Sequence, residues 1–497
     1  MIHFDTTASR YRQLGLWLLA TGLLCLALAD LAVITHSPWQ ELARLASGFI
    51  SPDLSASDAV WRALGLTLSF ALQGVGLAVL VGSLLSLCWH WRWVRALCAV
   101  LRSIHELFWG LMFLQLFGLS ALTGVLAIAV PYSGIIAKVF GEMLEESDRR
   151  PARAAPGGSD ALSLFLFARL PMVWRGLCQY SAYRLECGIR SSAILGFIGL
   201  PTLGFQMESA FRQGDYGAGS ALLYLLLLVI ATQRWWLRAR LLPVYLLLAL
   251  VLSPPVSSGA GADMAGFLQQ LTPAPLRDGE GWGALLSWLS ALWHSQGASA
   301  IWQTLVLGTA ALLGSFVLAL LLVPLVSPHF GNRASRAGSH LLLVLMRSTP
   351  EFLIAFVLLL ILGPSMLPGI LALALHTGAI IAFLCARLST QVRLRDDAPR
   401  GLSRYTWELL PRLFPNFLAL SLYRWEIFMR ETAILGILGI QTLGFYVDSA
   451  FAEFRLDRAL ALILMGVALN LMVDALSRRI RARLRLQHTA IVLERPQ

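Results

Sequence analysis

The residues of this chain best suited to chemistry are acids and arginines set inside long apolar stretches. Arg102 and Glu106 stand four positions apart, and Arg347 and Glu351 repeat this spacing. Residues four apart on a helix share one face, so we expect each pair to bridge along its helix. An ionisable side chain inside a membrane costs about 2.5–3.5 kcal/mol on insertion scales, and such residues usually have a function. The pairs therefore either line a pathway for a polar solute or neutralise each other and lock a helix in place.

A second set of charges follows the same spacing in two other apolar stretches. Glu186 and Arg190 form one pair, Glu426 and Arg430 form another, and Glu431 is added only beside the second. Arginines that approach a gap between membrane helices can act as successive contacts for an anion. The alternative is structural pairing along one helix. We assign no catalytic residue in either set.

Glycines recur at a fixed spacing directly after these charges. Small residues let helix backbones approach closely, so we expect these positions to pack at the interface between two halves of the protein. The alternative is that they act as a gating hinge. The set is Gly196, Gly199, Gly204, Gly436, Gly439 and Gly444.

These charges and glycines belong to an internal sequence duplication. Residues Ala193–Phe205 and Ala433–Phe445 are nearly identical, and each follows a Tyr-Arg-x-Glu and precedes a Ser-Ala-Phe. A repeat of this length between apolar runs predicts two copies of one multi-helix unit, related by a pseudo-two-fold axis. We place the first unit at 1–242, with its core at 58–242, and the second at 243–497, with its core at 301–484.

The elements that carry these residues are predicted to be membrane-spanning helices. Hydrophobic residues make up 57% of the chain and charged residues 13%, against about 45–50% and about 25% in soluble domains. A span needs roughly 20 apolar residues, and about twelve such runs are present, six in each half. We therefore predict an all-α polytopic membrane protein. The runs are Leu14–Ile34, Leu64–Leu87, Ala96–Phe117, Leu122–Phe140, Met172–Ile198, Ser220–Trp236, Leu241–Val256, Trp302–Leu325, His340–Leu362, Ile370–Leu388, Phe414–Ile440 and Ala459–Leu476.

Arginines between the runs predict the orientation. With Arg10 and Arg12 on the cytoplasmic side, every strongly basic loop and the basic tail also fall inside, as the positive-inside rule requires. The opposite loops, Ser37–Asp58 and Ser253–Ser299, carry little positive charge. We expect both termini in the cytoplasm and the protein in a bacterial inner membrane. The net charge of +11 then reflects topology, and no nucleic-acid partner is inferred from it.

The longest internal loops, Glu142–Leu170 and Arg387–Leu410, predict contacts with another protein. In each, glycine breaks one element, a serine caps a short new helix, and a proline ends that helix. Exposed aromatic and aliphatic side chains on it suit a partner's groove; a helix lying flat on lipid is the alternative. The expected coupling residues are Gly158, Ser159, Phe165, Phe167 and Pro171 in the first copy and Gly401, Ser403, Trp407 and Pro411 in the second, with Leu162, Leu164 and Tyr405 as further exposed apolar residues.

At these loops the chain resembles the membrane subunits of binding-protein-dependent ABC importers. Gly158 and Leu170-Pro171 match the loop signature of that family, while Ala152 stands where the family has a glutamate. The resemblance is closest to the phosphonate-type branch. That branch shares Arg-x-x-Pro-Glu, found here as Arg347 to Glu351, together with the Tyr-Arg-x-Glu and the glycine run.

The resemblance implies a type I importer with the MetI-like permease fold, both permease units being fused in one chain. It implies two copies of an ABC ATP-binding subunit and a periplasmic substrate-binding protein as partners. The implied cargo is a small oxyanion, phosphonate above all. No cofactor would bind this chain, since ATP and Mg would bind the partner.

Three other readings are weighed against this one. A nucleotide-binding loop needs a lysine, and the only lysine, Lys138, lies in an apolar run, so the chain is not its own ATPase. A secondary active transporter with two six-helix halves is the main alternative. A membrane enzyme would need clustered His, Asp or Cys. The six cysteines show no metal-ligand spacing and predict no metal site: Cys25, Cys88, Cys98, Cys178, Cys187 and Cys385. No role is assigned to Asn470 and Asp474 in the last run.

Overall fold

The computed structural model describes residues 6–35, 37–53, 58–148, 150–154, 158–253 and 263–484. Throughout these residues the regular elements are helices, and none is a strand. This agrees with the predicted all-α class. Residues 149 and 155–157 of the first long internal loop, and the end of the basic tail from residue 485, fall outside the described residues.

The described residues group into two compact units. The amino unit holds 44–268 and the carboxy unit holds 6–43 together with 269–484. Helix α1 (Thr6–Leu28) therefore packs in the carboxy unit against α16 (Ala298–Val326), and α12 (Leu242–Leu252) packs in the amino unit against α3 (Asp58–Leu87). The predicted boundary after residue 242 follows the sequence repeat and stays a prediction. The packing instead places α1, the first apolar helix of the first copy, in the carboxy unit, and α12, the first of the second copy, in the amino unit.

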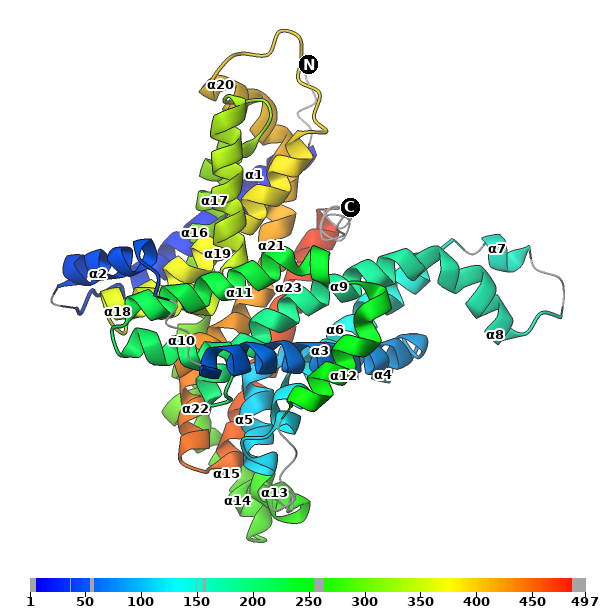
Figure 1. Cartoon of the computed structure of the whole chain (residues 1–497), viewed down its shortest axis with the longest axis vertical. Helices are drawn as coiled ribbons and strands as arrows, with labels where there is room; N and C mark the ends of the chain where they lie inside the picture. The colour runs from blue at the N-terminus through cyan, green and yellow to red at the C-terminus, as the bar shows by residue number, and fades with distance from the viewer. Residues whose placement is uncertain are drawn as a thin grey trace. The chain divides into compact units, whose positions relative to one another are not determined.

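In the amino unit, α3 packs along α6 (Ala121–Glu146), and α9 (Leu170–Ile194) joins them (Figure 1). Glycines permit the approach, because a Cβ on Gly74 would come within 2.8 Å of Cβ of Ile128. The remaining elements of this part of the chain are α2 (Pro38–Ile50), α4 (Arg92–Ser103), α5 (Glu106–Phe117), α7 (Arg150–Arg153), α8 (Ala161–Ser163), η1 (Leu164–Arg169), η2 (Leu195–Ile198), α10 (Leu203–Arg212), α11 (Tyr216–Trp236), η3 (Ala239–Leu241) and α13 (Met264–Leu271).

The carboxy unit repeats this arrangement, with α16 packed along α19 (Met366–Ser389) and α21 (Leu410–Ile437) against both. Its core holds fully buried side chains such as Phe352, Phe417 and Phe428. The other elements are α14 (Ala274–Arg277), α15 (Gly281–Leu292), η4 (Trp293–Gly297), α17 (Arg333–Ser348), α18 (Glu351–Leu362), α20 (Leu402–Arg404), η5 (Tyr405–Leu409), α22 (Leu443–Ala452) and α23 (Leu456–Arg483).

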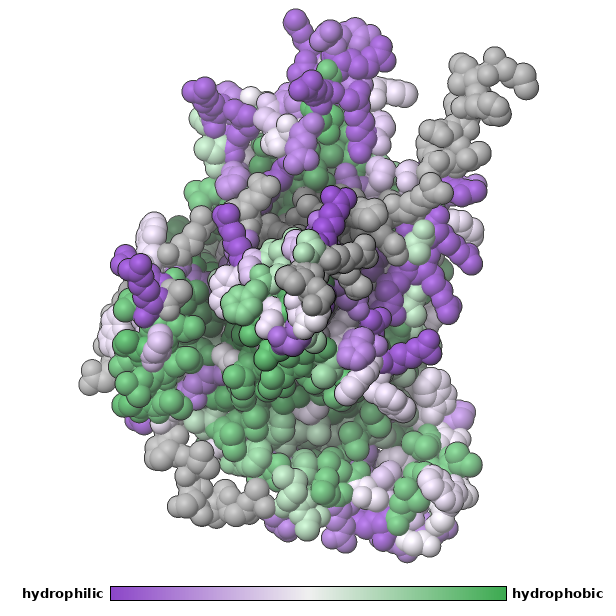
Figure 2. Space-filling model, turned by 90° about the vertical axis from the view of Figure 1, so that its right-hand side faces the viewer, coloured by the Kyte–Doolittle hydropathy of each residue, from purple (hydrophilic) through white to green (hydrophobic). Residues whose placement is uncertain are grey.

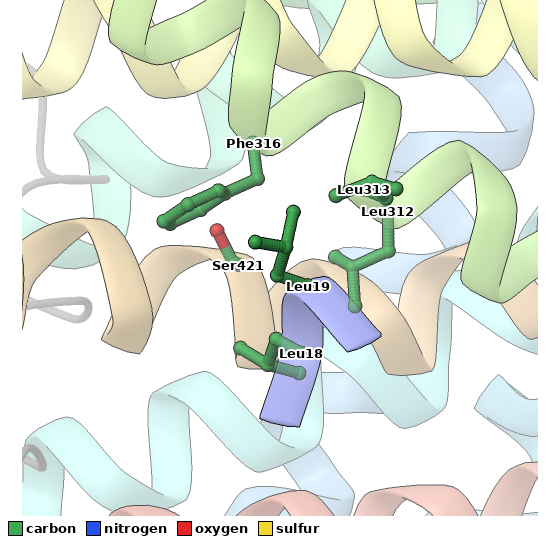
Figure 3. Close-up of a pocket in the computed structure, with 6 residues that line it drawn as sticks. All are labelled: Leu18, Leu19, Leu312, Leu313, Phe316 and Ser421. Carbon is green, nitrogen blue, oxygen red and sulfur yellow. The ribbon is translucent and has the colours of Figure 1, made fainter. Parts of the chain in front are cut away.

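Helix α1 meets the carboxy unit through close contacts. A Cβ on Gly22 would lie 2.6 Å from Cβ of Leu313, so glycine is what allows this approach. The small pocket left between α1, α16 and α21 has a volume of about 10 Å³ and is lined by Leu18, Leu19, Leu312, Leu313, Phe316 and Ser421 (Figure 3). That volume holds about one water molecule. The pocket is a packing gap and not a site for a solute.

Among the described residues, eight helices are long and apolar enough to cross a membrane, or ten if each of two bent helix pairs counts as one span. The chain is thus a polytopic membrane protein, and Figure 2 shows hydrophobic side chains over much of the visible face. The predicted twelve spans are not confirmed. Helix α12 has only 11 residues, and α21, 28 residues long, carries the charges Arg424, Glu426, Arg430 and Glu431.

The structure corrects the predicted spans Ala96–Phe117 and His340–Leu362. Each is two helices, α4 with α5 and α17 with α18, bent by 88° and 89°. At the second bend Pro350 has no N–H to donate and holds an extended backbone (ψ 137°). At the first bend His105 takes the same extended form and caps α5, its Nδ1 accepting the N–H of Leu107 at 3.2 Å.

The prediction that Pro171 and Pro411 each end a short separate helix is also wrong. Helix runs without a break from Ala161 to Ile198, 38 residues in all, and a π-helical turn precedes Pro171 at the start of α9. Proline is tolerated there because the first turn of a helix needs no N–H donor. At about 1.5 Å per residue this helix is roughly 57 Å long, so one end must project beyond a hydrocarbon core of about 30 Å.

The predicted serine caps differ as well. Asp160, and not Ser159, caps α8 by accepting the N–H of Ser163 at 2.9 Å. In the second copy Gly401 (φ 65°) stands at the cap without a side-chain bond, and Ser403 lies inside α20. In the first loop the helix begins at Ala161, so Asp160 stands at the cap position. In the second, glycine fits the positive φ.

Candidate functional site

Polar side chains meet at the bend between α4 and α5. Oε1 of Glu106, the first residue of α5, accepts a hydrogen bond from Oγ of Ser191 at 2.7 Å, and Ser191 lies 2.8 Å from the hydroxyl of buried Tyr132. This network joins α5, α6 and α9. Arg102 lies in the last turn of α4 and Glu106 starts α5, so the two residues do not share one helix face as predicted, and the same holds for Arg347 and Glu351. An ion pair within each couple stays a prediction.

Each unit places a histidine beside the glutamate at its bend. His105 Nε2 lies 3.7 Å from Glu106 Oε2, and His376 Nε2 lies 3.5 Å from Glu351 Oε2. The two histidines come from different elements, since His105 is in the bend itself whereas His376 is on α19.

An ungapped alignment of the copies explains this difference. It pairs Gly124 with Gly369, Pro131 with His376, and His105 with Pro350. Histidine and proline have therefore exchanged positions between the copies, and each unit keeps one of each. The glutamate at the bend keeps its histidine neighbour in both.

The two histidines differ in where their protons sit. Nδ1 of His105 accepts the N–H of Leu107, so its Nε2 carries the hydrogen and faces Glu106 at 3.7 Å. Nδ1 of His376 is 3.0 Å from the carbonyl oxygen of Thr349, an acceptor, so Nδ1 carries the hydrogen there. Nε2 of neutral His376 then carries no hydrogen. It attracts Glu351 only when the imidazole or the carboxylate binds one more proton.

The second charge pair is found on α9, where Nη2 of Arg190 lies 3.6 Å from Oε1 of Glu186. In the carboxy unit Glu426 and Glu431 are buried on α21, where Glu431 occupies the position of Ser191 in the first copy. Arg430 lies on the same helix, one residue before Glu431. Acid has thus been added to the second copy at the point where the first has a hydroxyl.

The last helix supplies further polar groups against α21. Asn470 and Asp474 are buried on α23, and Asp474 forms an ion pair with Arg478 one turn later. Arg481 of α23 stacks on the ring of Tyr423 of α21, 5.6 Å from its centroid.

The arginine of the first Tyr-Arg-x-Glu is held by tyrosines. Arg184 donates to the hydroxyl of Tyr180 at 2.8 and 2.6 Å, and its guanidinium lies 5.0, 5.5 and 5.8 Å from the rings of Tyr180, Tyr183 and Tyr132. Sequence reasoning missed Tyr132, Ser191 and His376. Ser191 lies on α9 beside the predicted pair Glu186 and Arg190, whereas Tyr132 on α6 and His376 on α19 lie on helices with none of the predicted charges or glycines. Their signal was a polar residue on an otherwise apolar run.

The glycines make their close approach inside each copy. A Cβ on Gly196 would lie 2.1 Å from the amide nitrogen of Phe205, and one on Gly204 would lie 1.8 Å from the carbonyl oxygen of Ala193. In the second copy Gly436 and Gly444 give 2.1 and 2.2 Å to the equivalent atoms. Gly199 and Gly439 adopt φ of 92° and 94° where the chain turns between helices. A further role at an interface between the halves stays a prediction.

The two loops predicted to contact a partner expose one aromatic residue each, at the same position of the repeat. Phe167 is 81% exposed and Trp407 is 79% exposed. The residues two positions earlier turn inward: Phe165 is partly buried, and Tyr405 is buried with its hydroxyl donating to the carbonyl of Leu320 at 2.7 Å. The prediction of an exposed Tyr405 is therefore wrong.

Comparison with known proteins identifies the relatives of the chain. It is 26% identical to the phosphate-import permease protein PhnE of Mycolicibacterium smegmatis over 427 residues, 78% of this chain and 77% of that protein. It is 28% identical to the phosphite transport system permease protein PtxC of Stutzerimonas stutzeri, over 44% of this chain and 85% of the relative. No family model and no solved structure matches the chain.

A third relative, the putative cryptic phosphonate transport system permease protein PhnE2 of Escherichia coli, is 27% identical over 22% of this chain and 88% of the relative. The predicted resemblance to phosphonate-type permeases is thus confirmed. One relative matches across most of the chain while PtxC matches with less than half of it, as expected where two permease units are fused.

Proposed function

We propose that this chain is the permease of an ABC importer that carries a small phosphorus oxyanion, phosphonate or a close relative, into the cytoplasm. The similarity to a phosphate-import permease across 78% of the chain carries this proposal. The relatives are transport subunits, and the only lysine of the chain, Lys138, lies inside α6, so ATP hydrolysis is assigned to separate subunits. Those subunits hold ATP and Mg.

The exposed aromatics Phe167 and Trp407 are the proposed contacts with two copies of the ATP-binding subunit. Both lie near the start of a helix that continues into a membrane span, so a movement of the ATP-binding subunit at the helix start also moves the span. A periplasmic binding protein delivers the substrate on the opposite side. The membrane is the bacterial inner membrane, with both termini in the cytoplasm, in keeping with the arginine distribution.

The bends that start at Glu106 and Glu351 are the proposed lining of the pathway. Broken helices at membrane depth are tolerated where they border a cavity or are buried in protein. Arg102, Arg347, Arg190 and Arg430 supply positive charge near these bends and are proposed to contact the anion in passage.

Reconstitution tests the proposal. Proteoliposomes that contain the chain and its ATP-binding subunit, supplied with binding protein, should take up phosphonate, phosphite or phosphate only when ATP is hydrolysed. A secondary active transporter is the alternative. Uptake by the chain alone, driven by an ion gradient without ATP, would establish that alternative instead.

A further inference from the structure

The carboxy unit carries a pocket of about 390 Å³. One wall comes from α14 and α15 and includes Arg277 and Trp288, and the other comes from the start of α23 and includes Phe454, Arg455 and Arg458. Helix runs without a break from Gly281 to Val326, 46 residues or roughly 69 Å. Such a helix exceeds the membrane core of about 30 Å, and the predicted orientation puts its α15 end on the outer side of the membrane.

Phe454 has an unfavourable backbone. Its φ of 56° makes it the one non-glycine residue with positive φ within the described ranges. The first copy has Gly214 at the same position, with φ 75°, and glycine is the residue that this conformation favours. The phenylalanine ring is 74% exposed, so it gains little from packing in this chain. Folding alone does not explain its presence.

The neighbouring charges are also unfavourable for the fold. In the first copy Asp215 caps α11 by accepting the N–H of Ala218 at 3.0 Å. The second copy has Arg455 at this cap and Arg458 in the first turn of α23, where the helix dipole disfavours positive charge. Arg455 lies 3.7 Å from Glu453, whereas Arg458 forms no ion pair with any described residue.

Asp457, the acid in the pocket wall, is already engaged by backbone. Its carboxylate accepts the N–H of Arg458 at 2.8 Å and that of Ala274 at 3.4 Å, which ties α14 to α23. The lining also includes three arginines, of which Arg277 lies 3.6 Å from Asp278, together with Trp288 and Phe454. Arginine and aromatic residues dominate the binding energy of protein interfaces.

We propose that this pocket is a docking site for the substrate-delivering protein, which inserts a carboxylate-bearing loop among the arginines and receives Phe454 in an apolar recess. The proposal rests on the proposed function. Figure 1 shows α14 and α20 at opposite ends of the carboxy unit, so the pocket lies at the end away from the proposed ATP-binding contact at Trp407. Because the first copy has Gly214 and Asp215 instead, docking is stronger on the carboxy unit.

The test uses the full complex in nanodiscs, the purified periplasmic binding protein that serves this permease, and a measurement of the Kd between them. Phe454→Gly should raise the melting temperature of the chain, since strain is relieved, and weaken docking about tenfold or more. Arg458→Glu should weaken docking similarly, and more so at low salt. Trp282→Ala, at an exposed aromatic of α15 outside the pocket wall, should change neither value.

Unchanged docking in both Phe454→Gly and Arg458→Glu overturns the proposal. The proposal is also overturned if the pocket binds inorganic phosphate alone, or anionic lipid vesicles alone, and the two variants lose that binding while their docking stays normal. If wild-type complex binds no delivery protein and takes up no phosphorus oxyanion, the proposed function itself fails. If the variants still take up substrate at saturating binding protein, docking is weakened while the proposed function holds. This outcome distinguishes failure of the docking proposal from failure of the proposed function.

Discussion

Nε2 of His376 lies 3.5 Å from Oε2 of Glu351, while Nδ1 of the same ring is 3.0 Å from the carbonyl oxygen of Thr349. The imidazole thus links α19 to both sides of the bend between α17 and α18. In the amino unit the bend is held differently, since His105 caps α5 through Nδ1 and faces Glu106 through Nε2. The copies keep the same pair of residue types at their bends with different connections.

The first prediction is that the His376–Glu351 pair stabilises the carboxy unit through an energetic coupling. In a double-mutant cycle with His376→Leu and Glu351→Gln, we expect a coupling energy between about 0.5 and 3 kcal/mol, because the residues are in direct contact. Thermal unfolding of the purified chain measures it. Additive effects of the two replacements would show that the contact contributes nothing.

The matched cycle in the amino unit uses His105→Leu and Glu106→Gln. His105→Leu should also lose the cap of α5, at about 0.5–2 kcal/mol, as caps usually do. His376→Leu has no such component, since Pro350 stands at the cap of α18. Equal losses from the two histidine replacements would contradict the different connections.

The second prediction concerns the close approach at Gly204. Its Cβ would meet the backbone carbonyl of Ala193 at 1.8 Å, and backbone cannot move aside as a flexible side chain can. Gly204→Ala should therefore destabilise the chain by about 1–3 kcal/mol or prevent folding. Gly338→Ala is the control, because a Cβ there meets nothing within 4 Å and α17 should gain up to about 1 kcal/mol. A stable, active Gly204→Ala chain would refute the steric argument.

Much of the fold could be predicted from the sequence because apolar runs and the duplication are strong local signals. The bends were missed because Ala96–Phe117 and His340–Leu362 each look like one apolar run. Only His105 marks the break in the first, and only Pro350 marks the break in the second. The glycine contacts within each copy were missed because spacing shows that two backbones meet but not which ones. The partners of Glu106 could not be read from spacing, since Ser191 and Tyr132 lie on other helices.

The third prediction is a pH effect at the start of the first coupling helix. Hydrogen bonds from the hydroxyl and then the N–H of Ser163 hold the pKa of Asp160 below its ordinary value. A lowered pKa in the folded state means that the cap stabilises the helix above the unfolded-state pKa and is lost as pH falls through the folded-state pKa. Hydrogen exchange of the α8 amides, corrected for intrinsic rates, should speed up over that acid range. In Asp160→Asn, which caps without titrating, this pH dependence should be absent.

The fourth prediction assigns the outward aromatics to the ATP-binding subunit. Phe167 and Trp407 occupy equivalent positions and are largely exposed, so their replacement by Asp should leave the membrane fold intact. Burial of such a ring on a partner is worth about 1.5–3 kcal/mol. Each replacement should therefore reduce co-purification of the ATP-binding subunit roughly ten- to hundredfold in affinity terms, and the double replacement should abolish ATP-dependent uptake.

The inward neighbours of these aromatics supply the matched control. Tyr405→Phe removes the hydrogen bond to the carbonyl of Leu320 and should lower the stability of the chain by about 0.5–1.5 kcal/mol. It should not weaken binding of the ATP-binding subunit. Phe165→Leu should behave likewise, because Phe165 is partly buried. If Phe167→Asp and Trp407→Asp leave binding and uptake unchanged while Tyr405→Phe impairs partner binding, the docking face has been placed on the wrong side of these helices.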